Sequence, residues 1–487
     1  MDPILLLIPV LLPAAGGLVL LRRPVKDAGK HKAAIMALTL LTSLVSVALL
    51  FLVKREGRVL LSFTEGFSFA LKADGFGILF AGMLTVLWPL VTLYAFSYME
   101  GEHNQRRFFD FFLMTYGVTL GAAFSANMLT MYVFFEMLTL VTLPLVSHKE
   151  NKDSMFAGRR YLRYCLGGAA LGLAAVVTVT LAGGGEFAYG GCVNSRFDPE
   201  LMRVMFLAGF FGFGAKAAVF PLHSWLPTAS VAPTPVTALL HAVAVVNTGM
   251  FCVGRLVWYA FGTELLAGTW AQKACVAAAG FSLLYGAAMA LKQRHLKRRL
   301  AFSTMSNLSY MLFGLALMTP AGFTGSMAHM LFHSVMKMTL FLCAGAVMHR
   351  TEREYIYEME GLGRKMPVTF ACFTVSSLSL SGIPPLCGFV SKWQLMQAGM
   401  QAGTWDAWFG TGALLAAAFL CAIYTLTVCV RAFFPGRQAD LTGTENVKEA
   451  DWRMLVPIGF FTLMNLIFGI CQTPVLKLLA GIAAGNC

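Results

Sequence analysis

Residues 327–347 read MAHMLFHSVMKMTLFLCAGAV. This stretch is apolar enough to cross a bilayer, yet it carries His329, His333 and Lys337 at intervals of four residues. Positions four apart on an α-helix differ by only about 40° in direction, so the three side chains form one stripe about 12 Å long. A charge at the bilayer centre costs at least ~2.5 kcal/mol and usually faces a protein interior or water. The stretch therefore predicts a buried membrane helix with a line of ionisable groups along one side.

The whole chain has the composition of an all-α polytopic membrane protein. Its 487 residues are 57% hydrophobic and 13% charged, and the mean hydropathy is +0.69. These values exclude a water-soluble domain. Apolar runs of roughly 20 residues, the length that spans a bilayer, predict about 14 transmembrane helices at 3–21, 32–53, 73–98, 109–126, 128–147, 157–182, 203–221, 235–261, 272–291, 301–318, 322–349, 367–398, 408–434 and 452–472.

The basic residues follow this predicted topology. A net charge of +13 could indicate nucleic-acid binding, but 25 of the 37 Lys and Arg fall in the loops after odd-numbered helices, eight on the other side, and four inside apolar runs. By the positive-inside rule, the odd loops are cytoplasmic and both termini external. We therefore expect a multi-pass protein of the cell (inner) membrane, with the lipid bilayer rather than nucleic acid as its surroundings and 3–21 as a retained span.

No cofactor is expected. The eleven cysteines contain no CxxC pair and lie mostly in apolar runs, where Cys behaves as a small hydrophobic residue. The glycine clusters at 183–185 and 190–191 lack the strand-to-helix context of a nucleotide loop. Without metal, nucleotide or soluble domain, the chain must receive energy from partners or from an ion gradient.

Two further ionisable groups lie in the fifth and seventh predicted helices. Glu136 is near the middle of its helix, where a lone carboxyl group stays protonated unless a cation is near. Lys216 supplies such a cation, and Pro221 interrupts the helix five residues later. A broken membrane helix is tolerated only inside protein or beside water. His241, in the next helix, could accept a proton from this region; packing alone could also explain it.

The twelfth predicted helix must also be interrupted. A continuous helix over 367–398 would be ~48 Å long at ~1.5 Å per residue, well beyond a ~30 Å hydrocarbon core. Gly382, Pro384 and Pro385 mark the break, and Lys392 follows them. A lysine that extends to the membrane surface is the alternative interpretation of this residue.

The ionisable groups together predict a proton relay along the middle of the membrane, since histidine can both accept and release a proton near neutral pH. Discontinuous seventh and twelfth helices are typical of transporters built from two inverted repeats. The predicted organisation is helices one to three (1–108), a first five-helix repeat (109–261), a second (272–434), and helix 14 with a tail (452–487).

Four segments carry a resemblance to a known family: FFEMLTL, the stretch from Gly212 to Ala242, HMLFHSVMKMTLFLCAGAV and SLSGIPPLCGFVSKW. In this order they resemble the antiporter-like subunits of respiratory complex I, membrane-bound hydrogenases and Mrp-type cation/proton antiporters. The resemblance implies fourteen helices with inverted repeats, a Glu136–Lys216 pair, Lys337 as the central lysine and Lys392 in the second broken helix. The chain departs at Asn247, where many members carry lysine.

These observations predict a proton-translocating or cation/proton-antiporting membrane subunit. Its expected partners are other membrane subunits of a multisubunit complex, and its ions are H⁺ with or without Na⁺. Such a protein is not catalytic alone; it would serve a translocase or an antiporter. Two alternatives remain open: a secondary carrier that couples a small solute to protons, and a purely structural membrane anchor.

Overall fold

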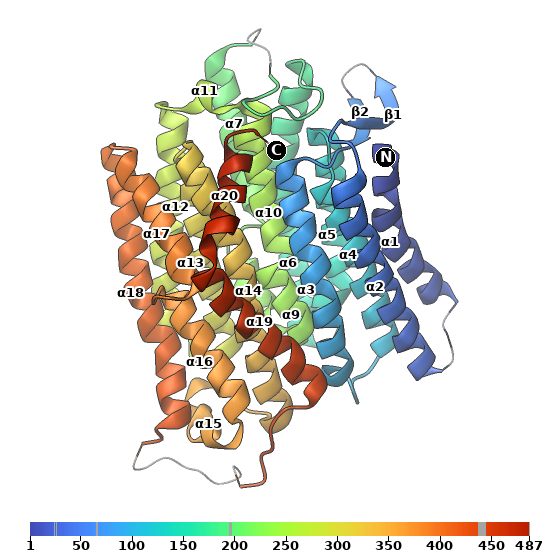
Figure 1. The fold of residues 1–487 in the computed structure, drawn as a ribbon, viewed down its shortest axis with the longest axis vertical. Helices are drawn as coiled ribbons and strands as arrows, with labels where there is room; N and C mark the ends of the chain where they lie inside the picture. The colour runs from blue at the N-terminus through green and yellow to red at the C-terminus, as the bar shows by residue number, and fades with distance from the viewer. Residues whose placement is uncertain (24, 26, 65–66, 194–196, 437–444, 487) are drawn as a thin grey trace.

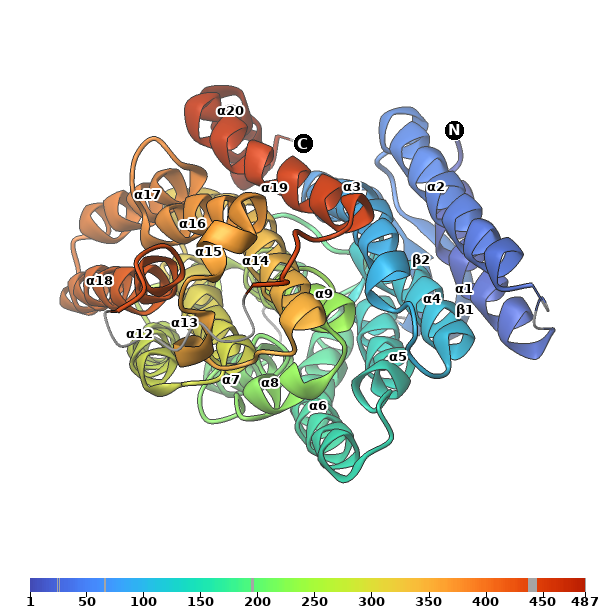
Figure 2. The same cartoon turned by 90° about the horizontal axis from the view of Figure 1, so that it is seen from below.

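The computed structural model describes residues 1–23, 25, 27–64, 67–193, 197–436 and 445–486. The chain runs up and down as long helices, which form one elongated bundle (Figures 1 and 2). Parts of two predicted loops, at Lys26 and at 437–444, lie outside the described residues. The first and last described residues lie at the same end of the bundle (Figure 1).

The first half of the chain contains one β-hairpin as well as helices. Its elements are η1 (Pro3–Leu6), α1 (Leu7–Arg22), α2 (Ala28–Leu52), β1 (Arg58–Thr64), β2 (Phe67–Leu71), α3 (Gly75–Tyr98), α4 (Gln105–Ala123), α5 (Met128–Val146), α6 (Lys152–Leu181), α7 (Pro199–Gly214), α8 (Trp225–Thr228), η2 (Ala229–Val231), α9 (Thr234–Ala242), α10 (Val245–Arg255), the π-helix η3 (Leu256–Phe261) and α11 (Thr263–Leu266).

The second half is helical. Its elements are α12 (Trp270–Lys292), α13 (Leu296–Ala316), α14 (Pro320–Thr351), η4 (Ile356–Met359), α15 (Leu362–Lys365), α16 (Pro367–Ser381), α17 (Cys387–Gln401), α18 (Trp405–Phe433), α19 (Trp452–Ile470) and α20 (Gln472–Ala483).

The predicted polytopic α-helical fold is confirmed. Within the described residues, ten helices are long and apolar enough to cross a membrane. The helices at the other four predicted spans, α4, α7, α13 and the α16–α17 pair, are shorter or carry charged and polar residues. The exact number of fourteen spans, the two repeats and the boundaries of the four segments stay predictions.

The β-hairpin is an addition that the apolar pattern did not predict. β1 and β2 pair antiparallel between α2 and α3, at the end of the bundle that holds the termini (Figure 1). The hairpin docks on the turn between α4 and α5, where the Ala70 amide donates to Thr130 Oγ (2.9 Å) and the Lys72 amide donates to the Phe124 carbonyl (2.8 Å). It thereby fixes α3 against α5.

Three interruptions shape the centre of the bundle. α7 ends at Gly214, seven residues before Pro221, so the break in the seventh helix begins earlier than the sequence predicted. α16 and α17 are separated by residues 382–386, which include Gly382, Pro384 and Pro385. The eighth helix, predicted as continuous over 235–261, is divided at Val243 and Ala244 into α9 and α10.

α14 is the central helix. From Gly322 to Met348 every residue except Leu331 is buried. In the view along the bundle, α14 lies between α13, α9 and α16 (Figure 2). This position explains how one apolar helix can hold three ionisable groups, because none of them faces lipid.

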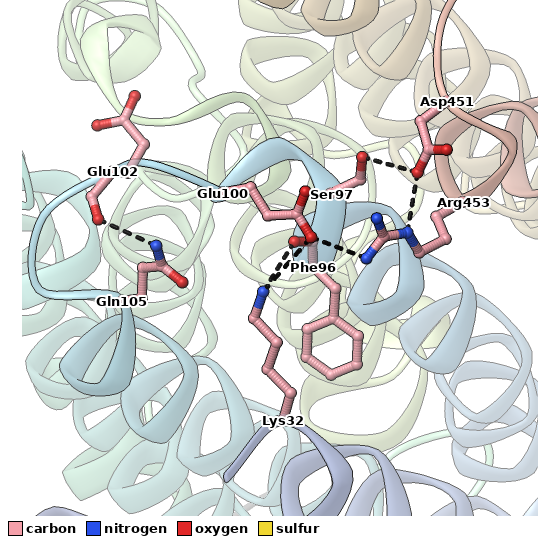
Figure 3. A network of polar contacts seen from close by, with 8 residues as sticks. All are labelled: Lys32, Phe96, Ser97, Glu100, Glu102, Gln105, Asp451 and Arg453. Carbon is pink, nitrogen blue, oxygen red and sulfur yellow. Dashed lines mark hydrogen bonds and ion pairs between the residues drawn. The ribbon is translucent and has the colours of Figure 1, made fainter. Parts of the chain in front are cut away.

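An ionic network joins α2, α3 and α19 at the end of the bundle opposite the hairpin. Glu100, which follows α3, accepts from Arg453 of α19 at 2.8 Å and lies 3.8 Å from Lys32 Nζ of α2. Asp451 accepts from Arg453 Nε (2.8 Å) and from Ser97 Oγ (3.0 Å). Figure 3 shows these contacts. Here ionic contacts between the three helices accompany the apolar packing of buried side chains such as Met99 and Met454.

Candidate functional site

Lys337 lies at the middle of α14 and is fully buried. Its Nζ atom donates to Ser303 Oγ (2.7 Å) and to the Leu300 carbonyl (3.1 Å), both on α13. The Tyr424 hydroxyl of α18 lies 2.8 Å from the same Ser303 Oγ. The amine is therefore held by neutral oxygens.

His329 and His333 continue the same face of α14 and are also fully buried. Their ring centroids are 6.0 Å apart. His329 Nδ1 lies 2.8 Å from Ser391 Oγ of α17. His329 Nε2 and both ring nitrogens of His333 have no hydrogen-bond partner among the described residues. Buried polar atoms are nearly always hydrogen-bonded, so these three nitrogens are exceptions within the described part of the protein.

Lys392 is buried beside the break between α16 and α17. Its Nζ donates to the Leu380 carbonyl (2.6 Å). In a continuous helix this carbonyl would accept from the amide of residue 384, but Pro384 has no N–H. The proline thus leaves this carbonyl, one residue before the end of α16, without a helical donor. Lys392 Nζ donates to it, and Cys421 Sγ lies 3.5 Å from it. Lys392 Nζ also lies 5.0 Å from the centroid of the Tyr310 ring.

Tyr310 connects this lysine to the stripe on α14. Its ring is stacked on His329 with centroids 5.3 Å apart. The structure therefore brings the predicted residues His329, His333, Lys337 and Lys392 into one cluster built from α13, α14, α17 and α18.

Lys216 lies two residues beyond the end of α7 and is fully buried. Its Nζ donates to the Phe135 carbonyl of α5 and lies 3.6 Å from the centroid of the Phe135 ring. Gly249 of α10 permits this position, because a Cβ there would lie 2.6 Å from the Ala217 nitrogen. The chain has to pass very close to α10 to bury the lysine.

Glu136 follows Phe135 directly and is part-buried rather than buried. It lies in electrostatic range of Lys216. Among the described residues, however, no ion pair joins the two, and Lys216 donates to the preceding carbonyl instead. In this structure Glu136 and Lys216, the pair implied by the resemblance, lie near each other but make no direct contact.

His241 lies near the end of α9, where the eighth helix is divided. It is fully buried with its ring 5.1 Å from that of Phe341 on α14. One residue later, the Ala242 carbonyl accepts from Asn247 Nδ2 (2.9 Å) and from Ser334 Oγ (2.9 Å), and Asn247 also donates to Ser334 (2.8 Å). These side chains replace the backbone bonds lost at the break.

The predicted residues therefore fall into two groups with a polar junction between them. Lys216 and Glu136 form the first group, and the α14 cluster with Lys392 forms the second. His241, Asn247 and Ser334 lie between α9, α10 and α14. The two groups and the residues between them lie on neighbouring helices. A continuous proton relay through all of them stays a prediction.

Two buried polar contacts, one ion pair and one histidine–carboxylate hydrogen bond, were missed by the sequence reasoning. Asp74, the N-cap of α3, accepts two hydrogen bonds from Arg255 of α10, that from Nη2 being 2.6 Å. His31 of α2 lies 2.9 Å from Asp110 of α4. An arginine inside an apolar run needs a buried acid, so Arg255 indicated that a buried ion pair exists. Its partner could not be identified from the sequence, because Asp74 is 181 residues away.

Histidine, cysteine and carboxylate side chains can also ligate metal ions. Among the described residues, no group of three or more such side chains could hold a metal ion.

The site and the bundle define a class: a polytopic membrane protein with a buried line of lysines and histidines beside broken helices. A sequence profile described as "NADH:quinone oxidoreductase/Mrp antiporter, TM" matches residues 125–420. A second, "NADH-Ubiquinone oxidoreductase (complex I), chain 5 N-terminus", matches 63–109. The chain belongs to the NADH:quinone oxidoreductase/Mrp antiporter family of membrane proteins.

Individual relatives agree with this assignment. The chain is 31% identical over 480 residues to a "Probable K(+)/H(+) antiporter" protein of Rhizobium meliloti (strain 1021), covering 96% of this chain and 47% of the relative. It is 31% identical over 420 residues to "NADH-quinone oxidoreductase subunit N" of Desulforudis audaxviator (strain MP104C), covering 81% of each. The chain thus spans about half the length of the first of these relatives.

A solved structure has the same fold. A chain of the membrane-bound sulfane sulfur reductase, an archaeal respiratory membrane complex, superposes with a TM-score of 0.86 at 21% identity, over 99% of this chain and 97% of that chain. At this identity, the likeness concerns the fold.

Proposed function

We propose that this chain translocates protons as one membrane subunit of a multisubunit complex. The observation that carries the proposal is Lys337, a fully buried amine at the centre of α14 whose described partners are the neutral oxygens of Ser303 and Leu300. An amine without a buried carboxylate partner can release its proton at modest cost, because no ion pair is broken. A purely structural lysine would be better served by a permanent counter-ion.

The helix breaks support the same proposal. Lys392 is bonded to a carbonyl that Pro384 leaves free, and Lys216 follows directly on the end of α7. Irregular backbone inside a membrane protein supplies polar groups at a depth where a regular helix has none. Protons would then pass among Lys216, His241, His333, His329, Lys337 and Lys392, with Glu136 modulating the charge on Lys216.

The orientation is part of the proposal. The loops rich in Lys and Arg lie at one end of the bundle, so that end is placed in the cytoplasm and both termini outside. The membrane is the cell (inner) membrane. Moving one charge against the membrane potential requires ~2.3 kcal/mol per 100 mV, and partner subunits or a cation gradient would supply this energy.

The test uses the complex purified with its partners and reconstituted into vesicles. A pH-sensitive dye reports acidification when the driving reaction or a Na⁺ gradient is applied. We expect Lys337→Ala to abolish proton movement while the complex still assembles, and Lys477→Ala, an exposed lysine on α20, to leave it unchanged.

Replacing Na⁺ by choline distinguishes proton pumping from Na⁺/H⁺ exchange. Proton movement that requires an added organic solute would favour a secondary carrier. Full transport by Lys337→Ala in correctly assembled complex would refute the proposed role of the lysine.

A further inference from the structure

An apolar groove lies on the membrane-facing side of the bundle, outside the ionisable cluster. Its volume is about 430 Å³, and its walls come from α2, α3, α14, α19 and α20. Ligand pockets commonly measure ~300–1,000 Å³. The floor is one face of α3, with Ile78, Gly82 and Val86 at helical spacing, and Phe461 of α19 lies on the opposite wall.

Glycine opens the floor of this groove. A Cβ added at Gly82 would meet only Leu50 Cδ1, at 3.9 Å. The position is therefore not filled by tight packing of another helix, as glycines at close helix contacts are. Phe51, at the end of α2, has 84% of its surface exposed beside the groove. The size of this apolar hollow matches that of a ligand pocket.

The groove occupies the half of the bundle that holds the hairpin. Its lining residues come from the end of α2, the first part of α3, the last part of α19, and α20. At the opposite end, the Lys32–Glu100–Arg453 network joins α2, α3 and α19 (Figure 3). The same three helices are thus joined by ions at one end and flank an apolar groove at the other.

Arg55 gives the groove a charged end. It lines the groove just after α2 and is exposed. Neither Arg55 nor the adjacent Lys54 side chain has a hydrogen bond or ion pair with any residue that the structure describes. An arginine guanidinium binds a phosphate with two parallel hydrogen bonds. An apolar channel with a free guanidinium at the membrane surface matches the two parts of a phospholipid.

We propose that this groove binds one phospholipid, with an acyl chain along α3 between Gly82 and Phe461 and the phosphate against Arg55. The site is separate from the proton path, although Leu331 and Val335 of α14 form part of its wall. The bound lipid fills the space between α3 and α20 and so supports the outer face of the central helix. The proposal is independent of the proposed function.

The first test is photo-labelling of the full chain, in its purified complex, by a phosphatidylglycerol with a diazirine on the acyl chain. Mass spectrometry should locate the label on α3 and α20. Gly82→Leu fills the groove and should remove most of that label. Gly167→Leu, at an exposed position on α6 with no heavy atom within 4 Å of an added Cβ, is the matched control and should label as the natural chain does.

The second test measures the lipid retained through detergent purification. Arg55→Gln should weaken retention about tenfold, because a hydrogen-bonded charge contact of this kind is lost. Lys54→Gln removes the same charge one residue away, outside the groove lining, and should change retention little. Equal losses would show general surface attraction and overturn the site.

The same experiments test whether a lipid is what fills the groove. Equal labelling of Gly82→Leu and the natural chain, with both correctly assembled, would overturn the proposal. A cross-link from the groove to a partner protein in place of lipid would overturn it as well, because a protein helix would then fill the groove.

Discussion

The Nζ atom of Lys337 lies 2.7 Å from the Oγ atom of Ser303, and the Tyr424 hydroxyl lies 2.8 Å from that same oxygen. A buried amine, a serine and a tyrosine from three different helices are thus joined by two hydrogen bonds. Because a hydroxyl both donates and accepts, Ser303 can follow a change in the protonation of Lys337 by rotating. The contact therefore stabilises the amine in either charge state.

Removing this hydroxyl should slow transport. Ser303→Ala deletes one bond to the charged amine, worth about 1.5–3 kcal/mol, so the initial rate of proton flux in vesicles should fall roughly tenfold or more. Ser309→Ala on the same helix is the control, because the Ser309 hydroxyl donates only to the Met305 carbonyl of its own helix. Equal rates for the two variants would argue against the coupling.

The buried Asp74–Arg255 pair should dominate local stability. Asp74→Asn keeps the cap of α3 but leaves the arginine unpaired, which costs about 3–5 kcal/mol in buried pairs. Thermal unfolding of the purified chain in detergent measures the loss. The exposed Arg203–Glu200 pair supplies the control, since Arg203→Gln should cost ~0–1 kcal/mol. Combining Asp74→Asn with Arg255→Met should recover part of the stability; a larger loss in the double variant would contradict this account.

A backbone N–H at residue 384 should compete with Lys392 for the Leu380 carbonyl. Pro384→Ala provides an N–H within reach of the Leu380 carbonyl, so α16 can extend and the lysine loses its acceptor. Transport should fall while assembly is kept. Pro367→Ala is the matched control because Pro367, at the first position of α16, replaces no intrahelical donor. Unchanged transport by Pro384→Ala would show that this carbonyl is dispensable.

Acid should destabilise the turn between α5 and α6 through His148. Burial, followed by the charges of His103 and Arg107, lowers the pKa of His148 from 6.5 to about 4, and Glu150 acts in the opposite direction. Between these values the unfolded chain binds a proton that the folded chain does not, so stability is full above pH 6.5 and declines as the pH falls toward 4. Melting temperatures in detergent across this range measure the decline, and His148→Gln should reduce it. An identical pH profile in the variant would exclude His148 as the cause.

Much of the site could be predicted because charged residues in apolar runs are easy to recognise. Lys216, Lys337 and Lys392 were identified in this way, and Gly382 with the following prolines marked the twelfth helix as broken. The division of the eighth helix could not be predicted, because no glycine or proline lies at Val243 or Ala244. That break depends on Asn247 and on Ser334 of a distant helix, which take the role of the missing backbone donors.

The sequence also could not predict which of these side chains are in direct contact. The sequence placed Glu136 opposite Lys216, but the ammonium bonds to the Phe135 carbonyl, since the closing turn after α7 brings it to the backbone of α5. The sequence also indicated no partner for Arg255, because Asp74, which pairs with it, is 181 residues away in the chain.

The sequence by itself determined that this is a helical membrane protein and which ionisable groups lie in its apolar segments, because the cost of burying charge and unpaired backbone is large and acts residue by residue. The tertiary structure alone decided which of those groups meet. Contacts such as Lys337 with Ser303, or Lys392 with Leu380, depend on the rotation and depth of packed helices. Those variables are set by the shapes of all the neighbouring side chains together.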